Sequence, residues 1–306
     1  GLKAGLFLGE APDYRGVLEF ADLQIPGAYR DGIEPAMRRI DEQLLRNSLA
    51  KRQRTGHKGD YGHVLIIGGG EGMPGAVRLA GEAALRTGAG LVSVATHPSH
   101  AAILVASRPE LMPHGIEGPD ALAPLIERAD VIAFGPGLGR SEWARTLFEF
   151  VRGLSLPMVW DADALNWLAE QPGKASRRVL TPHPGEAGRL LGLGVQEVQA
   201  DRPAALSALR DKFGGTIVLK GAGTLVSTDG LPFLCTAGNP GMGSAGMGDV
   251  LTGVIAALVG QGLDLRTAAA VGVEVHARAG DRAAASGERG LIASDVLREL
   301  RAVVNP

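Results

Sequence analysis

The sequence predicts an α/β protein, a three-layer α/β/α sandwich around a mostly parallel central sheet. Two observations support this prediction. Short runs rich in Val, Ile and Leu alternate with stretches of helical periodicity, and glycine-rich loops directly follow several of the runs. Strands that are apolar along their whole length are typical of parallel sheets with helices on both faces. Ligands of such sheets bind beyond the carboxyl ends of the strands, so these loops are where a site is expected.

Each element is predicted from its own residue pattern. Residues 76–87 place apolar side chains at helical spacing, which gives one apolar face. After Phe233, a glycine-rich loop precedes two long helical stretches, 249–260 and 266–285, and a short helix begins at Ser294. The predicted strands cover residues 63–67, 91–96, 131–134, 158–161, 179–181, 217–220 and 225–227.

The first 50 residues differ in pattern from the rest of the chain. Two short extended stretches are expected around residues 12–14, and a charged helical run is expected over residues 35–54. We therefore predict two parts: an N-terminal segment with a linker over residues 1–50, and a main domain over residues 51–306.

The composition excludes several classes of protein. The 31 Lys and Arg residues nearly balance the 33 Asp and Glu residues, and aromatic residues make up only 4% of the chain. Neither the basic surface nor the stacking platform of a nucleic-acid binder is expected. No apolar run approaches the roughly 18 residues of a membrane-spanning helix. The single Cys235 excludes an internal disulfide framework and favours a cytoplasmic location.

The strongest chemical signal is the glycine-rich stretch 238–253, which leads into an apolar helix. Its glycines allow several backbone N–H groups to converge at a helix N-terminus, and this combination favours an anion site. Asp249 at the helix start is a plain N-cap in the simplest interpretation, but a cap needs one residue and not a whole glycine-rich loop. A carboxylate beside an anion site can act as general base for a hydroxyl that attacks a phosphoryl group.

Three further loops follow predicted strands. Residues 220–224, Lys-Gly-Ala-Gly-Thr, suit contact with a phosphate or a ribose, and a surface turn explains them equally well. Residues 68–76 and 135–139 place several glycines directly after a strand, which favours close approach of a ligand over a tight turn alone. The spacing in residues 220–224 fits neither a Walker A loop nor a dinucleotide fingerprint.

Two short polar motifs complete the set. Asp161 and Asp163 follow a strand, two residues apart, and either hold Mg²⁺ together with phosphate oxygens or cap the next helix. His183 lies between two prolines in a rigid loop, so we expect it to contact a substrate rather than only solvent. The other histidines show no spacing that indicates a metal site.

Taken in order, these motifs resemble those of one family. Residues 68–76, 82–92, 135–139, 161–166, 181–186, 220–224 and 246–253 are similar to motifs of the ADP-dependent NAD(P)H-hydrate dehydratases, repair enzymes of the ribokinase-like fold. The resemblance extends over residues 54–304. Residues 3–26 resemble the end of the NAD(P)H-hydrate epimerase domain that precedes the dehydratase in many bacterial members. The resemblance thus implies that residues 1–50 are an epimerase-domain tail and linker, from which no epimerase activity is expected.

The resemblance also implies a role for residues in each motif. Asp249 would be the catalytic base beside an anion hole formed by Gly246, Met247 and Gly248. Met247 is a departure, since the family often has Ser there; because the anion hole uses backbone N–H groups, the exchange should spare the chemistry. The nucleotide-binding residues would be Lys220, Gly221, Ala222, Gly223, Thr224 and Gly248. The substrate-binding residues would be Ala76, Gly137, Gly139, Asn166, His183 and Asp249.

The implied reaction is that of a carbon–oxygen lyase acting on hydrated NADH or NADPH. The hydroxyl at C6 of the hydrated nicotinamide ring is a poor leaving group, so Asp249 would deprotonate it as it attacks the terminal phosphate of ADP or ATP. Loss of phosphate would then restore the ring and leave AMP from ADP. Mg²⁺ would shield the phosphate charge, and the family implies a homotetramer.

Two other functions fit part of the same pattern. A kinase of the same fold, acting on a vitamin precursor such as hydroxyethylthiazole or on a sugar, would share the glycine-rich loop and Asp249. Such a kinase does not need the motifs around His183 and residues 135–139 in this form. A regulatory module that binds a nucleotide without turnover gains nothing from a carboxylate beside the phosphates. The dehydratase is therefore the favoured function.

Overall fold

One mixed sheet runs through the computed structural model, which describes residues 2–29 and 32–306. Gly1, Arg30 and Asp31, which belong to the predicted N-terminal segment, lie outside the described residues. The strands are β1 (Arg38–Arg39), β2 (His63–Ile67), β3 (Leu91–Thr96), β4 (Met112–Gly115), β5 (Val131–Phe134), β6 (Met158–Trp160), β7 (Arg178–Leu180), β8 (Thr216–Leu219), β9 (Leu225–Val226) and β10 (Phe233–Leu234). Their order across the sheet is β1-β10-β9-β8-β7-β6-β5-β2-β3-β4.

The predicted α/β class and mostly parallel sheet are confirmed. Every neighbouring pair from β8 across to β4 is parallel, and only the β8–β9 and β9–β10 pairs are antiparallel within the described residues. The predicted strands match β2, β3 and β5 and differ by about one residue elsewhere. The prediction missed β4, an edge strand that contains Pro113. Proline cannot donate a hydrogen bond to a neighbouring strand, so a proline in the sequence argues against predicting a strand there.

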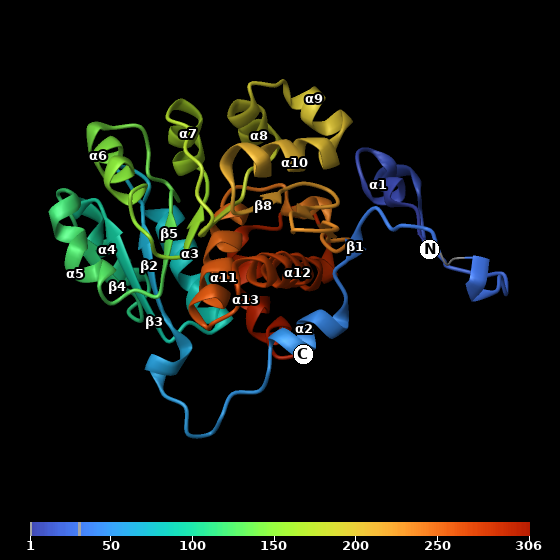
Figure 1. Cartoon of the computed structure of the whole chain (residues 1–306). Coiled ribbons are helices and arrows are strands. Elements are labelled where there is room, and N and C mark those ends of the chain that lie inside the picture. The colour runs from blue at the N-terminus through green and yellow to red at the C-terminus, as the bar shows by residue number, and fades with distance from the viewer. Residues whose placement is uncertain (1, 30–31) are drawn as a thin grey trace.

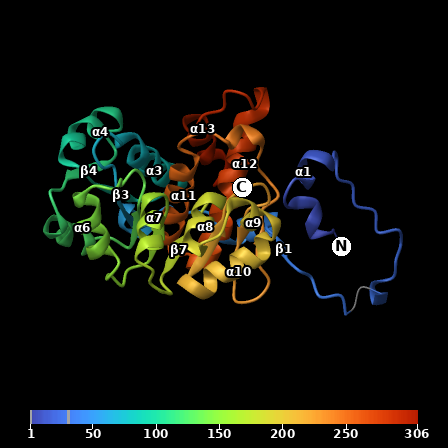
Figure 2. The same cartoon turned by 90° about the horizontal axis from the view of Figure 1, so that it is seen from above.

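Helices cover both faces of this sheet (Figures 1 and 2). Among the described residues, no helix is both long enough and apolar enough to span a bilayer. The helices are α1 (Ala11–Tyr14), α2 (Glu42–Ser48), α3 (Pro74–Thr87), α4 (Ala101–Ser107), α5 (Ala123–Ile126), α6 (Glu142–Val151), α7 (Asp163–Glu170), α8 (Pro184–Leu191), α9 (Val195–Ala200), α10 (Arg202–Phe213), α11 (Met247–Gly260), α12 (Leu265–Ala283) and α13 (Ala293–Val303).

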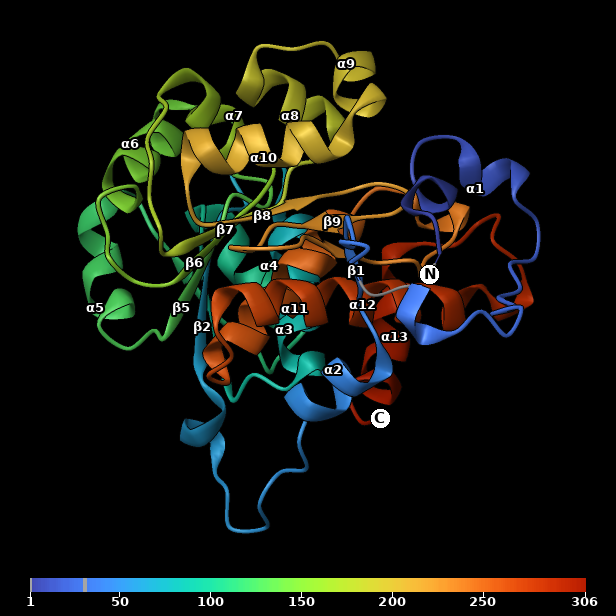
Figure 3. The ribbon, with the colours of Figure 1, turned by 45° about the vertical axis from the view of Figure 1, so that its right-hand side comes forward.

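The three-layer arrangement follows from the alternation of side chains along buried strands. In β2, Val64 and Ile66 pack into the core shared with α3, α11, α12 and α13, whereas Leu65 and Ile67 pack on the opposite side with α6, α7, α8 and α10. Successive residues of a strand point to opposite faces of the sheet, so a wholly apolar strand needs cover on both faces. Figure 3 shows the two helical layers with the sheet between them.

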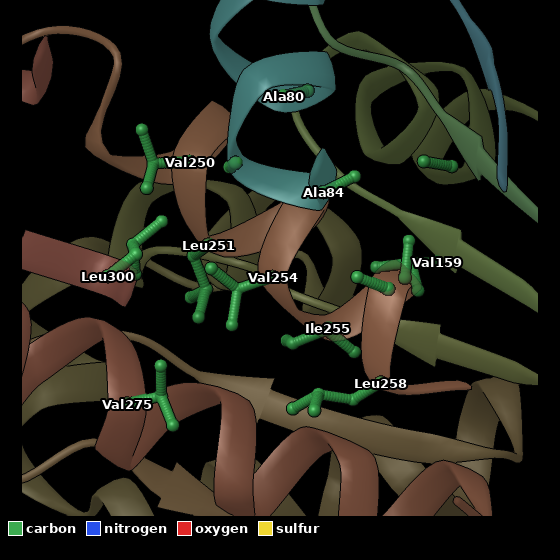
Figure 4. Packing of buried hydrophobic residues seen from close by; sticks show 14 of the residues in the cluster. Ala80, Ala84, Val159, Val250, Leu251, Val254, Ile255, Leu258, Val275 and Leu300 are labelled. Atoms are coloured by element: carbon green, nitrogen blue, oxygen red, sulfur yellow. The ribbon is translucent and has the colours of Figure 1, made fainter. Parts of the chain in front are cut away.

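Helix α11 lies at the centre of one of these layers. It is apolar around most of its circumference and contacts α3 on one side and α12 on another, as its packed side chains in Figure 4 illustrate. Gly253 permits the closest approach, because a Cβ added there would lie 2.0 Å from the carbonyl oxygen of Ala80. A helix buried in this way is held rigidly, and its N-terminus is fixed relative to the strand ends.

The N-terminal segment differs from its prediction. The expected extended stretches are a 3-10 turn over Ala4–Phe7 and the short helix α1, where Pro12 suits the first turn of a helix. The expected helical run over residues 35–54 is helical only in α2, because Asp41 caps that helix. Arg38 and Arg39 instead form β1 beside β10 at the sheet edge.

Candidate active site

The predicted anion site is the N-terminus of α11. Gly246 precedes the helix in the left-handed region at φ +88°, and a Cβ added there would lie 2.6 Å from a methyl group of Leu79. Only glycine fits this turn without strain. The side chain of Met247 is buried. Asp249 lies in the first turn of the helix, beside the free N–H groups that favour an anion.

A buried charge pair lies directly against this helix terminus. Lys220 follows β8 and Asp161 follows β6, and the Lys220 Nζ lies 2.8 Å from Asp161 Oδ1. The Oγ1 atoms of Thr181 and Thr252 also donate to Asp161, at 2.8 Å and 3.0 Å. Burial alone would raise the pKa of Asp161, but Lys220 and these hydrogen bonds hold it below its ordinary value.

Two further carboxylates face the same lysine. Burial raises the pKa of Asp249 to about 7, and the neighbouring Asp161 carboxylate adds to the rise while Lys220 opposes it. Burial likewise raises the pKa of Glu186 to about 7, with Lys220 lowering it and Asp161 raising it. The Glu186 Oε2 lies 3.8 Å from Lys220 Nζ. Asp249 therefore titrates near neutral pH, where a general base is most useful.

A cavity of about 510 Å³ opens on one side of this cluster. Its lining includes residues 220–224, all predicted to bind a nucleotide, together with Met247 and Gly248. The structure thus brings the predicted nucleotide loop and the predicted anion site to one cavity. His276 of α12 also lines the cavity. Burial and the nearby Lys220 ammonium lower the pKa of His276 to about 4.

Hydrogen bonds from Arg202, a residue that was not predicted to belong to the site, hold the nucleotide loop. Arg202 at the start of α10 is almost fully buried and donates to the backbone carbonyls of Leu219, Lys220 and Gly223 at 3.0–3.3 Å. An arginine at the start of an ordinary helix gives no signal of this role in the sequence. Thr181, Glu186 and Thr252 lie within the predicted motifs 181–186 and 246–253, but no role was predicted for them. Only the fold brings them to Asp161 and Lys220.

Two of the predicted substrate residues, Ala76 and Gly137, lie where glycine-rich loops meet. The backbone N–H groups of Gly69 and Gly70 donate to the carbonyls of Pro136 and Gly137 at 2.9 Å and 2.7 Å, which joins the loops after β2 and β5. Gly137 has φ +56°, and a Cβ added there would lie 2.9 Å from the Cβ of Ala76. These contacts bring Ala76 and Gly137 together and explain the glycines.

A chain of polar contacts links the remaining substrate residues. The Asp163 carboxylate accepts from the Gly139 N–H at 2.8 Å and from Asn166 Nδ2 at 3.2 Å. The Asn166 Oδ1 in turn accepts from Arg189 Nε of α8 at 2.9 Å. Asp163 therefore holds Gly139 and Asn166 close together, and we call this group of residues the rim.

His183 is the N-cap of α8. Its Nδ1 accepts from the backbone N–H groups of Gly185 and Glu186, at 3.0 Å and 3.4 Å, while Glu186 Oε2 accepts from the His183 N–H. The proton of the neutral ring is thereby assigned to Nε2, which remains able to donate to a ligand. Burial, with Lys220 and Arg189 nearby, lowers the pKa of His183, so the ring is neutral at pH 7.

Asp161 and Asp163, predicted either to hold Mg²⁺ or to cap the next helix, have different hydrogen-bond partners. Asp161 is bonded to Lys220 and two threonines, whereas Asp163 is bonded to Gly139 and Asn166. In the described part of the chain, no group of three or more His, Cys, Asp or Glu side chains is arranged to hold a metal ion. A larger cleft of about 940 Å³, lined by Glu82, Arg86 and Arg108 among others, contains none of the predicted site residues.

The sequence matches one protein family over most of its length. The sequence model of the NAD(P)H-hydrate dehydratases matches residues 64–301. The bifunctional NAD(P)H-hydrate repair enzyme of Coxiella burnetii is 49% identical over 306 residues, which cover 99% of this chain and 63% of that protein. The chain spans about 60% of the length of the curated relatives it matches.

Two solved structures share the fold. A ribokinase-like superfamily protein of Enterococcus faecalis has a TM-score of 0.82 at 30% identity, with 89% of this chain and 96% of that chain covered. The ADP/ATP-dependent NAD(P)H-hydrate dehydratase of Bacillus subtilis, co-crystallized with ATP and Mg²⁺, has a TM-score of 0.76 at 28% identity, with 87% and 97% covered. The ribokinase-like architecture predicted from the sequence is therefore confirmed.

Proposed function

Because the chain belongs to the NAD(P)H-hydrate dehydratase family, we propose that it converts hydrated NADH or NADPH back to the reduced dinucleotide in a nucleotide-dependent reaction. One observation supports this proposal above the others. The Asp249 carboxylate, with a pKa of about 7, lies near enough to Lys220 and Asp163 for both charges to shift that pKa. Lys220 lines the cavity of the loop 220–224, and Asp163 binds Gly139 and Asn166. A base must lie near both groups if it joins a nucleotide phosphate to a hydroxyl of a second substrate.

The proposed reaction begins with phosphoryl transfer. Asp249 accepts the proton of the C6 hydroxyl as that oxygen bonds to the terminal phosphorus of the nucleotide, and the bond from this phosphorus to the bridging oxygen breaks. The N–H groups of Gly246, Met247 and Gly248 would stabilise the charge on the transferred group, as an oxyanion hole does. ADP as the donor leaves AMP, and ATP leaves ADP.

The second half of the reaction removes the phosphate. The ring nitrogen lone pair assists cleavage of the C6–O bond, phosphate leaves with the bonding electrons, and loss of a proton from C5 completes the dihydropyridine. Phosphorylation serves to convert hydroxide, a poor leaving group, into phosphate. The sum is hydrate plus ADP giving NADH or NADPH, AMP, inorganic phosphate and one proton, which balances in atoms and charge.

The substrate side would orient the dinucleotide. We propose that Ala76, Gly137 and Gly139 let the ligand approach the backbone closely, since their loops are joined edge to edge. Asn166 and the neutral His183 would donate or accept hydrogen bonds from its polar groups. None of these residues needs a charge to make the proposed contacts.

The excess of carboxylates in the site favours binding of Mg²⁺, although the described residues form no complete set of protein ligands for it. Asp161, Glu186 and Asp249 together outweigh the single ammonium of Lys220, and the pKa values of Glu186 and Asp249 are raised to about 7. Mg²⁺ usually takes one or two carboxylates with phosphate oxygens and water. Glu186 would hold the ion together with nucleotide phosphate oxygens, and the bound ion would neutralise charge on the phosphates.

The test is recovery of the dihydronicotinamide absorbance band after the protein is mixed with Mg²⁺ and hydrated NADH or NADPH. ADP and ATP are added in parallel, and a reaction without nucleotide is the control. Recovery that requires a nucleotide supports the dehydratase and identifies the donor. No recovery with either nucleotide, from protein that is shown to be folded, would overturn the proposal and favour a small-alcohol kinase of the same fold.

Three further expectations stay proposals. We propose a homotetramer and a cytoplasmic location, which sizing in solution and localisation of the full protein would test. We also propose that residues 1–50 are the tail of an epimerase-type domain with a linker, and that residues 51–306 form the dehydratase domain. Limited proteolysis that cuts near residue 50 and leaves the remainder intact would support that boundary.

A further inference from the structure

We propose that Asp161 is a positioning residue that holds the Lys220 ammonium and the N-terminus of α11 in place for phosphoryl transfer, and that it is not a magnesium ligand. The inference rests on the proposed function and adds a residue to it. Nothing in the family match assigns this role, and the sequence alone suggested a metal ligand or a helix cap.

The first argument is the number of elements that meet at one carboxylate. Asp161 follows β6, Thr181 follows β7, Lys220 follows β8 and Thr252 lies in the second turn of α11. All three partners donate to Asp161 at 2.8–3.0 Å. Asp161, Thr181 and Thr252 are almost completely buried. Hydrogen bonds to a buried carboxylate are strong, and removing one partner leaves the others uncompensated.

The second argument is the direction of the catalytic carboxylate. Thr252 follows Asp249 by three residues, so the two side chains lie on the same face of α11. A hydrogen bond from Thr252 to Asp161 therefore fixes the rotation of the helix that determines where Asp249 points. Gly248 permits this close approach, because a Cβ added there would lie 3.1 Å from Asp161 Oδ2 and 3.2 Å from Lys220 Nζ.

The third argument is the position of the lysine. With Asp161 as its partner at 2.8 Å, Lys220 is held at the end of β8 beside the α11 terminus. A lysine has four rotatable carbons and a compact charge, so without a fixed partner it would pair with whichever carboxylate is free. Asp161 thus keeps the ammonium away from Asp249, whose carboxylate must stay available to accept a proton.

The fourth argument is that Asp161 has little capacity left for a metal ion. Its Oδ1 already accepts from Lys220 and Thr181, and its Oδ2 accepts from Thr252. The remaining side of Oδ2 faces Gly248. A direct magnesium ligand would need to give up at least one of these donors inside a buried site, where an unpaired hydroxyl or ammonium is costly.

The test compares Asp161→Asn, Lys220→Met and the double variant in the full chain. We expect each single change to lower kcat by about 100-fold. The KM for the hydrate should stay within about threefold, and the Mg²⁺ concentration for half-maximal activity should be unchanged. The double variant should be no slower than the slower single variant, because both changes remove one interaction. A tenfold higher Mg²⁺ requirement in Asp161→Asn, with activity restored by added Mg²⁺, would overturn the inference in favour of a ligand role.

A second readout does not depend on turnover, so it separates this inference from the proposed function. Labelling of Lys220 by an amine-reactive reagent, measured by mass spectrometry, should increase in Asp161→Asn. Asp161 accepts from the Lys220 Nζ at 2.8 Å, so its loss releases the amine from the strand end and lets it reach the reagent. Unchanged labelling would contradict the proposal even if the wild-type protein shows no dehydratase activity.

A gentler variant guards against misfolding. Thr252→Val keeps the shape of the side chain and removes only its hydrogen bond to Asp161. We expect kcat to fall by about 3- to 10-fold, with Thr252→Ser restoring it. A loss that Thr252→Ser fails to restore would indicate a packing role and would contradict the positioning of α11 by Asp161.

Discussion

The two sides of the candidate site are built by different means. On the nucleotide side, buried charged groups from separate strands meet at one helix terminus, with Asp161 and Lys220 at their centre. On the substrate side, backbone hydrogen bonds between glycine-rich loops bring Gly137 to Ala76, and the polar side chains lie at the rim. The first side is set by electrostatics and the second by backbone shape.

This difference indicates how each side responds to change. A charge network in a site of low dielectric is sensitive to the loss of any member, because the remaining charges are left uncompensated. A rim built from backbone contacts tolerates changes of side chain and fails mainly when a Cβ blocks the approach of two loops. Variants on the nucleotide side should therefore affect kcat, and variants on the substrate side should affect KM.

The largest effect is expected at Asp249. Asp249→Asn removes the base without changing the size of the side chain, and kcat should fall by about 10³-fold. Steady-state kinetics with saturating nucleotide and hydrate would measure it, and nucleotide binding by calorimetry should remain within a few-fold. A variant that retains more than a tenth of wild-type kcat would contradict the role of Asp249.

The next effect is expected at Gly248. A Cβ there would press on Asp161 Oδ2 and Lys220 Nζ, at 3.1 Å and 3.2 Å, so Gly248→Ala should lower kcat by about 30- to 100-fold. Gly153→Ala is the matched control, because its nearest contact would be an ordinary 3.6 Å. Equal kinetics in the two variants would show that the pair does not need its close approach to α11.

Most of the fold and part of the site follow from the sequence. Apolar strands such as β2 and the glycine turn at Gly246 are local signals, so they were predicted with nearly correct bounds. The contacts of Asp161 with Thr181 and Thr252 are not local, since they join residues 20 and 91 positions apart. The sequence around a threonine or around Arg202 does not indicate which distant residue it will contact. Only the order of the strands brings these partners together.

The pH dependence should separate the two sides further. Asp249 must be ionised to accept a proton, and its pKa is raised to about 7. The kcat/KM for the hydrate should thus rise by about tenfold per pH unit below pH 7 and level off above it. Glu186→Gln is the control, because the pKa of Glu186 lies in the same range. It is measured at saturating Mg²⁺, since Glu186 is also proposed to hold the ion. If that variant loses the inflection, Glu186 and not Asp249 is responsible for it.

A smaller effect is expected on the substrate side. Gly137→Ala places a Cβ 2.9 Å from that of Ala76 at a φ of +56°, so the two loops must separate slightly. We expect the KM for the hydrate to rise by about 5- to 10-fold, with kcat nearly unchanged. A fall in kcat as large as the expected rise in KM would show that the substrate side also affects the rate of the chemical step.

The smallest effect concerns stability. The raised pKa of Asp249 favours the folded state at low pH, and this contribution is lost as pH rises from about 4 to about 7. Asp249→Asn should therefore unfold less readily than the wild type at pH 8, by about 4 kcal/mol, with no difference below about pH 4. Urea denaturation at both pH values measures this, and equal stability at pH 8 would contradict the burial of this charge.

The most direct test of the account follows the oxygen atom of the substrate hydroxyl. Hydrate prepared with a heavy oxygen isotope at C6 is converted in the presence of nucleotide, and the released phosphate is analysed by mass spectrometry. Phosphoryl transfer to that hydroxyl predicts one labelled oxygen in the phosphate for each dihydronicotinamide formed. Label found only in water, with unlabelled phosphate, would contradict phosphorylation and with it the role of Asp249 as the base for that step.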